Sequence, residues 1–152
     1  MILKTTILDY RLTLSFAKIT RVVGVNSNLP DGKHILMWDF DDVELPDVAN
    51  ELRLVQSAYK LPRITLLWSG TPNHWLAYCF KSCSWLAASR IVNNTNHVDR
   101  NFYKYSVYRE HFTLRVTPKH QREIKFWMIL ESPFPEDCNV DELRSFVKYQ
   151  TL

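Results

Sequence analysis

Glycine and cysteine are both scarce in this chain, and each scarcity excludes a class of protein. Only 3 of the 152 residues are glycine, whereas 46% are hydrophobic and 13% are aromatic. That composition excludes a disordered or low-complexity protein. Cys79, Cys83 and Cys138 are odd in number and irregularly spaced, which argues against a disulfide framework. No second Cys or Cys–His pair completes a zinc site, so we expect buried thiols in a reducing compartment.

Long apolar runs are also missing. No run approaches the roughly 20 residues of a membrane-spanning helix, and the first residues do not form the apolar region of a secretory signal. We therefore expect a soluble cytoplasmic protein that has no membrane partner. The formal net charge of +3 is mildly basic. It permits an anionic partner such as nucleic acid without requiring one.

The stretch from Ile35 to Asp42 reads Ile-Leu-Met-Trp-Asp-Phe-Asp-Asp and predicts a buried strand that ends in acidic residues. Because residues two apart on a strand share a face, we expect Asp39 and Asp41 to project together while Phe40 turns into the core. Two buried carboxylates repel each other unless a cation lies between them. Mg²⁺ or Mn²⁺ is the usual partner. An acidic pair at a strand end can also serve as a turn or a helix cap.

Strand and helix signals interleave along the rest of the chain. Apolar and polar residues alternate over residues 8–16, which predicts a half-buried strand. Apolar residues recur at helical spacing over 48–59, after Asp47, which we expect to cap this helix. Residues 97–111 fit either strand pieces or an exposed aromatic loop. We also expect strands at 64–68, 74–80, 112–117 and 124–130, and helices at 82–92 and about 140–149.

This order of elements predicts one α+β domain over residues 1–152. Several expected strands lie close enough in sequence to pair antiparallel, and the helices between them can cover one face. We therefore expect a two-layer sandwich with an RRM-like, mostly antiparallel sheet that is backed by helices.

Four short motifs of the chain together supply acidic, hydrogen-bonding and basic side chains. This is the combination that metal-assisted nucleotidyl transfer requires. Carboxylates hold the metals that activate a hydroxyl and stabilise the departing pyrophosphate. Basic and hydrogen-bonding groups hold the triphosphate in line for attack. The motifs are Asp39-x-Asp41, Ser69-x4-His74, Val98-Asp99 and Arg115-x3-Lys119.

These motifs resemble those of the archaeo-eukaryotic primase superfamily, the primase-polymerases of archaea, eukaryotes, plasmids and phages. The first family motif, an apolar strand ending in Asp-x-Asp, is similar to residues 37–41. The second, Ser-Gly followed by His, is similar to residues 69–74, with a longer gap than the shortest form. Val98-Asp99 is similar to the third, an apolar residue before Asp. The resemblance covers about residues 33–130 and suits a compact mobile-element member without a zinc-binding insertion or helicase domain.

The resemblance implies a template-directed nucleotidyltransferase that joins nucleoside triphosphates on a single-stranded nucleic-acid template. It also implies Mg²⁺ or Mn²⁺ as the cofactor, held by Asp39, Asp41 and Asp99. A helicase or accessory replication protein could be supplied in trans. The residues expected to contact the triphosphate are Ser69, His74, Arg115 and Lys119.

The third carboxylate has a rival in the sequence. Mg²⁺ demands near-octahedral geometry, so Asp39 and Asp41 alone would leave it poorly fixed. Glu131 ends the expected strand over 124–130 and could approach the site from there. We favour Asp99, because the apolar Val98 before it suggests a strand whose next residue faces the sheet surface.

Other interpretations of these residues remain open. A lone histidine after a turn is commonly structural, and late basic residues can be solvated edge charges. A basic and aromatic strip predicts base stacking and phosphate contacts, or else belongs to the core. It supports an alternative function, a non-catalytic single-strand-binding module. A rolling-circle initiator nuclease ranks last, because the chain has no His-x-His pair. In this strip the aromatic residues Phe102, Tyr103, Tyr105 and Tyr108 are interleaved with basic residues. The five residues of the strip that we expect to contact nucleic acid are Arg100, Tyr103, Lys104, Tyr105 and Arg109.

Overall fold

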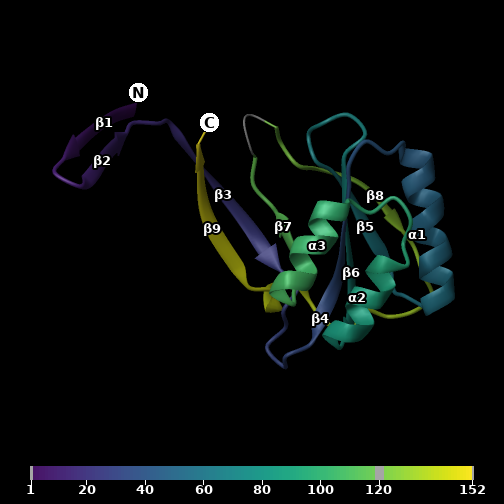
Figure 1. Cartoon of the computed structure of the whole chain (residues 1–152). Coiled ribbons are helices and arrows are strands. Elements are labelled where there is room, and N and C mark those ends of the chain that lie inside the picture. The colour runs from purple at the N-terminus through teal and green to yellow at the C-terminus, as the bar shows by residue number, and fades with distance from the viewer. Residues whose placement is uncertain (1, 119–121, 152) are drawn as a thin grey trace.

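A four-stranded antiparallel sheet forms the centre of the molecule (Figure 1). The computed structural model describes residues 2–118 and 122–151. The sheet contains β4 (His34–Phe40), β5 (Ile64–Trp68), β6 (Trp75–Cys83) and β8 (Lys125–Leu130), in the order β4-β6-β5-β8. Helix α1 (Leu45–Tyr59) connects β4 to β5, and β6 lies between these two strands. This is a split β-α-β unit, the core of ferredoxin-like sheets.

Helices cover one face of the central sheet. The buried apolar side chains of α1 and α2 (Trp85–Asn93) belong to the same core as β4. Because side chains alternate along a strand, Trp38 and Phe40 point together into this core, and both are fully buried. The indole Nε1 of Trp38 donates a hydrogen bond to Thr95 Oγ1, which follows α2, at 3.0 Å. The helical layer therefore fixes which face of β4 carries the acidic residues.

A second sheet shields part of the other face. It contains β7 (Thr113–Arg115), β3 (Ile19–Asn26) and β9 (Ser145–Thr151), in the order β7-β3-β9. Gly24 of β3 pairs with Arg115 on one side and with Phe146 on the other. The Phe146 ring occupies the space that a Cβ at Gly24 would need, at 2.3 Å. Arg115 and Phe146 therefore lie in one row on one face of this sheet.

The amino-terminal residues form a hairpin that projects from the rest of the molecule (Figure 1). Strand β1 (Ile2–Ile7) pairs antiparallel with β2 (Tyr10–Ser15), and Leu3 lies opposite Leu14. The alternation over residues 8–16 does form a strand, but all of β2 is exposed. The prediction of a half-buried strand is therefore wrong. Within the described part of the chain, β2 hydrogen-bonds as a strand to β1 alone.

The mixture of helices and mostly antiparallel sheets confirms the predicted α+β sandwich. Helix α3 (Arg100–Arg109) replaces the strand or loop expected at 97–111, because Asp99 caps it by accepting a hydrogen bond from the Phe102 N–H at 2.6 Å. The carboxyl-terminal helix was predicted wrongly as well. Residues Val140–Glu142 form one 3₁₀ turn, and β9 then pairs with the distant β3. At α1, Glu44 takes the N-cap position that we assigned to Asp47.

The helices of the described ranges include none that is long and apolar enough to cross a membrane. The three cysteines are free thiols, of which Cys79 and Cys138 are buried and Cys83 is partly buried. Cys138 lies in the loop before the 3₁₀ turn, where its Sγ is 3.7 Å from the Phe80 carbonyl oxygen. This contact joins the loop to β6.

Candidate functional site

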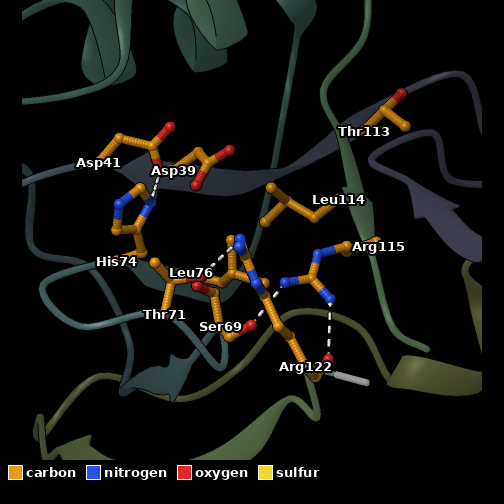
Figure 2. Close-up of a pocket in the computed structure, with 10 residues that line it drawn as sticks. All are labelled: Asp39, Asp41, Ser69, Thr71, His74, Leu76, Thr113, Leu114, Arg115 and Arg122. Carbon is orange, nitrogen blue, oxygen red and sulfur yellow. Dashed lines mark hydrogen bonds and ion pairs between the residues drawn. The ribbon is translucent and has the colours of Figure 1, made fainter. Parts of the chain in front are cut away.

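One cavity of about 480 Å³ brings together side chains from distant parts of the chain. Figure 2 shows Asp39 and Asp41 on one side, with His74 beside Asp41. The guanidinium groups of Arg115 and Arg122 lie across the cavity from Asp39. We call this space the Asp39 cavity; it has an acidic half and a basic half. Its lining residues are Asp39, Asp41, Ser69, Thr71, His74, Leu76, Thr113, Leu114, Arg115 and Arg122.

The end of β4 positions the acidic half. Phe40 is fully buried in the helical core, so strand alternation turns Asp39 toward the other face, where it pairs with Leu76 of β6. Asp41 follows the last residue of β4 and lines the same cavity. As the strand pattern predicts, the two carboxylates face one space. Asp42, which has a left-handed φ of 59°, then turns the chain away from the direction of β4.

The environment of Asp39 disfavours its negative charge. The pKa of Asp39 is raised to about 7, chiefly by burial and then by the negative charges of Asp41 and Asp99. The electrostatic interactions of Asp39 with His74 and Arg115 oppose this rise in its pKa. A cation bound among these carboxylates would relieve the remaining repulsion.

A tight turn between β5 and β6 positions Ser69 and His74. The Ser69 N–H donates to the His74 carbonyl at 3.1 Å, and Gly70 takes a φ of 89°, which favours glycine. This turn brings the His74 ring to the acidic half of the cavity. Its Nδ1 lies 2.5 Å from Asp41 Oδ1, and its Nε2 lies 3.3 Å from Asp42 Oδ1. The predicted Ser69 and His74 motif therefore lies beside the predicted acidic pair.

Arg115 and Arg122 form the basic half, and both are held by the turn between β5 and β6. Arg115 donates to the Ser69 carbonyl at 2.5 Å and to the Arg122 carbonyl at 3.5 Å. Arg122 donates to Thr71 Oγ1 at 3.2 Å. Burial lowers the pKa of Arg115, whereas the Asp39 carboxylate raises it. Arginine nevertheless stays protonated in proteins, so both guanidinium groups keep their positive charge.

Asp99 lies next to Asp39 for a different reason than the sequence suggested. Its backbone N–H donates to the Asp39 carbonyl at 2.8 Å, and its side chain caps α3. It is thus a helix cap, and the strand that Val98 suggested does not form. Asp99 lines a smaller cavity of about 220 Å³, which Asp39 lines as well.

Glu131 lies at the opposite end of the central sheet. Asp39 pairs with Leu76, and that row of residues continues through Leu67 to Phe126 of β8. At about 3.3 Å per residue, the five residues from Phe126 to Glu131 place Glu131 roughly 16 Å from this row. Of these two carboxylates, Asp99 is the one that lies near Asp39, and its role as a third ligand stays a prediction.

The basic and aromatic strip is divided between two sides of α3. Tyr105 and Arg109 line the smaller cavity beside Asp39, and the Arg109 guanidinium carbon lies 5.8 Å from the Tyr105 ring centroid. Arg100 and Tyr103 line a separate cavity of about 290 Å³ beside residues 92–98. Lys104 is exposed on the helix surface. The five residues therefore do not form one continuous surface.

Lys119, predicted to contact the triphosphate, lies outside the described residues. Arg122 occupies the basic half without having been assigned from the sequence. A signal existed, since Arg122 belongs to the basic segment after Arg115, but its place in the loop before β8 does not indicate that it approaches Asp39. The Glu123 carbonyl instead lies 2.7 Å from where a Cβ at Gly70 would be, so this segment packs on the turn between β5 and β6.

The acidic half offers oxygen ligands of the kind that Mg²⁺ and Mn²⁺ prefer. No group of three or more His, Cys, Asp or Glu side chains within the described ranges is already gathered as a metal-binding cluster. Mg²⁺, however, is commonly held by one or two carboxylates together with substrate phosphates. Asp39 and Asp41 in one cavity, Asp99 in the adjoining one and the raised pKa of Asp39 fit that kind of site.

No protein-family model, curated protein or solved structure matches this chain. Its resemblance to the primase superfamily therefore depends on the motifs quoted above and stays a prediction. The chemistry of the Asp39 cavity provides an independent basis for proposing a function.

Proposed function

We propose that this protein is a primase-polymerase-like nucleotidyltransferase that joins nucleoside triphosphates on a single-stranded nucleic-acid template. The observation that carries this proposal is the meeting of Asp39 and Asp41 with two guanidinium groups in one cavity. A nucleoside triphosphate with its metal ions has matching charges, because the cations suit the carboxylates and the phosphates suit the guanidinium groups. We propose the cytoplasm as its compartment and an accessory replication protein as a partner in trans.

The side chains divide the work according to their charge. Asp39 and Asp41, with Asp99 beside them, would hold Mg²⁺ or Mn²⁺. When bound, the metal ions would activate the attacking hydroxyl and stabilise the departing pyrophosphate. Arg115 and Arg122 bind and orient the triphosphate.

The turn between β5 and β6 supports both halves of the cavity. Ser69 acts through its carbonyl, which accepts a hydrogen bond from Arg115 and so orients that guanidinium group. His74 lines the cavity and is held against Asp41 and Asp42, so it orients the Asp41 carboxylate in the acidic half.

A second candidate function is a non-catalytic single-strand-binding module. The observation that favours it is the exposure of two tyrosines on α3, Tyr105 at 57% and Tyr108 at 87%. Exposed aromatic rings next to basic residues are typical stacking platforms for single strands. Binding by such a module would survive the loss of Asp39 and Asp41.

Incorporation of a labelled nucleotide on a single-stranded template, with and without a primer, tests the proposed function. With Mg²⁺ or Mn²⁺ present, we expect incorporation by the wild-type protein. Asp41→Asn should reduce it about 100-fold or more, because a metal ligand is lost. The matched control Asp47→Asn, an exposed residue in the first turn of α1, should keep full activity.

Two results would contradict this proposal. One is equal incorporation by Asp41→Asn and Asp47→Asn with Mg²⁺ as the only metal. The other is a wild-type protein that binds a single strand but incorporates no nucleotide under any of these conditions, which would favour the binding module.

A further inference from the structure

A second groove adjoins the Asp39 cavity on the far side of β7. This groove has a volume of about 460 Å³, and we call it the β9 groove. Thr113 and Arg115 line both spaces, so the β9 groove and the Asp39 cavity meet at β7. The residues that give the groove its character are Val22, Arg109, Arg115, Phe146 and Lys148.

The register of the second sheet explains why these side chains share one face. Arg115, Gly24 and Phe146 form one row across β7, β3 and β9. Lys148 lies two residues beyond Phe146 and therefore points to the same side, opposite Val22. Val22 is 4% exposed and forms the floor of the groove. Gly24 has no side chain, so the Phe146 ring settles over the sheet between the two basic residues.

The charge of the β9 groove is positive. Arg115 and Lys148 come from the sheet, and Arg109 comes from the last turn of α3. All the charged residues that line the groove, among those the structure describes, are basic. Arg109 also lines the smaller cavity beside Asp39, together with Tyr105. The groove therefore approaches Asp39 along two sides, one past Arg115 and one past Arg109.

We propose that the β9 groove is the path along which a single-stranded nucleic acid reaches the Asp39 cavity. This inference rests on the proposed function, since it assigns the template a route to that site. The groove matches a single strand in two respects. Arg109 and Lys148 can contact successive phosphates, and the Phe146 ring between Arg115 and Lys148 offers a stacking face for a base.

Binding of a short fluorescent single strand of mixed sequence, prepared as DNA and as RNA, tests the path by anisotropy. Arg109→Ala and Lys148→Ala should each weaken binding several-fold. Each should also lower the slope of log affinity against log salt by about 0.7, the value for one lost phosphate contact on a single strand. Arg53→Ala, an exposed arginine on α1, is the matched control and should change neither quantity.

Phe146→Leu examines the stacking part of the proposal separately. Leucine keeps an apolar side chain over Gly24 but removes the aromatic face. We expect a loss of about fivefold or more in single-strand affinity with no change in the salt slope. Circular dichroism of each variant shows whether the sheet is intact, and a nucleoside triphosphate should bind Phe146→Leu as it binds the wild-type protein.

The possible results separate this proposal from the proposed function. Unchanged single-strand affinity in both Arg109→Ala and Lys148→Ala would overturn the path, whatever the incorporation assay gives. Equal competition by a polyglutamate peptide would also overturn it, because the groove would then suit an acidic protein. Losses confined to the groove variants support the path. If the wild-type protein then incorporates no nucleotide, the path stands as a binding surface and the catalytic function fails.

Discussion

Strands β4 and β2 are both rich in apolar residues, yet their environments differ completely. Leu36 and Trp38 of β4 are fully buried, whereas Leu12 and Leu14 of β2 are 50% and 62% exposed. The helical layer and the second sheet pack around β4, while β2 pairs with β1 in a projecting hairpin (Figure 1). An apolar pattern therefore predicts a strand but does not predict its burial. Only the buried strand can hold a carboxylate whose pKa is raised.

The largest expected difference between these strands is in packing energy. Leu36→Ala should lower the free energy of unfolding by about 2–5 kcal/mol, because it leaves a cavity in a closed core. Leu12→Ala makes the same chemical change on an exposed strand and should alter it by about 0.5 kcal/mol or less. Urea denaturation of both variants measures the difference. Equal losses of stability would show that the hairpin is buried against other groups in solution.

The next effect concerns the carboxylate on the buried strand. The pKa of Asp39 in the folded protein, about 7, lies above the ordinary value for aspartate. Above about pH 7 Asp39 is therefore ionised in the folded protein, and its charge destabilises the fold in full. The penalty disappears as the pH falls through 7 toward the ordinary pKa. In metal-free buffer, Asp39→Asn should therefore raise the free energy of unfolding by roughly 1–3 kcal/mol at about pH 8 and by little at about pH 4.

A matched change in the hairpin provides the control for this pH dependence. Asp9 is exposed in the turn between β1 and β2, so Asp9→Asn should leave stability unchanged at both pH values. Denaturation curves at the two pH values test the pair of variants. The electrostatic explanation would be contradicted if Asp39→Asn raised the free energy of unfolding equally at the two pH values. A stabilising effect of Asp9→Asn would contradict it as well.

The smallest expected effect concerns an exposed and a partly buried tyrosine of the same helix, α3. Tyr105 is 57% exposed and lines the cavity beside Asp39, whereas Tyr103 packs against the core. Tyr105→Ala should weaken single-strand binding by about 1 kcal/mol with little change in stability. Tyr103→Ala should show the reverse, a loss of stability with the affinity retained. Anisotropy and thermal denaturation of both variants distinguish these outcomes, and a swapped pattern would reassign the stacking side of α3.

The elements that depend on local spacing were predictable from the sequence. Strands β4 to β6 and helices α1 and α2 follow apolar periodicity and turn residues, such as those between Trp68 and Trp75. Apolar periodicity did not predict the structure of the carboxyl-terminal segment. Its strand β9 forms because it pairs with β3, more than a hundred residues earlier, with Gly24 opposite Phe146. Periodicity within one segment carries no information about a partner so distant.

The candidate site was predictable to the extent that strand ends and turns define it. Asp39, Asp41 and His74 meet because β4 and β6 are antiparallel neighbours in the sheet, and β4 ends where β6 begins, at the cavity. Asp99 lies next to Asp39 because it is the N-cap of α3. The apolar Val98 before it suggested a strand and so did not predict this helix cap. Arg122 was missed because its position depends on how a loop packs onto the turn between β5 and β6.

Metal-dependent binding of a nucleoside triphosphate tests most directly the proposal that the acidic and basic halves of the Asp39 cavity act together. A fluorescent nucleoside triphosphate is titrated into the protein with Mn²⁺ and then with excess EDTA. We expect binding that requires Mn²⁺ and that weakens about tenfold or more in both Asp39→Asn and Arg122→Gln, a loss of at least 1.4 kcal/mol, while Asp9→Asn binds normally. The same affinity in all four proteins, with and without Mn²⁺, would contradict the proposal.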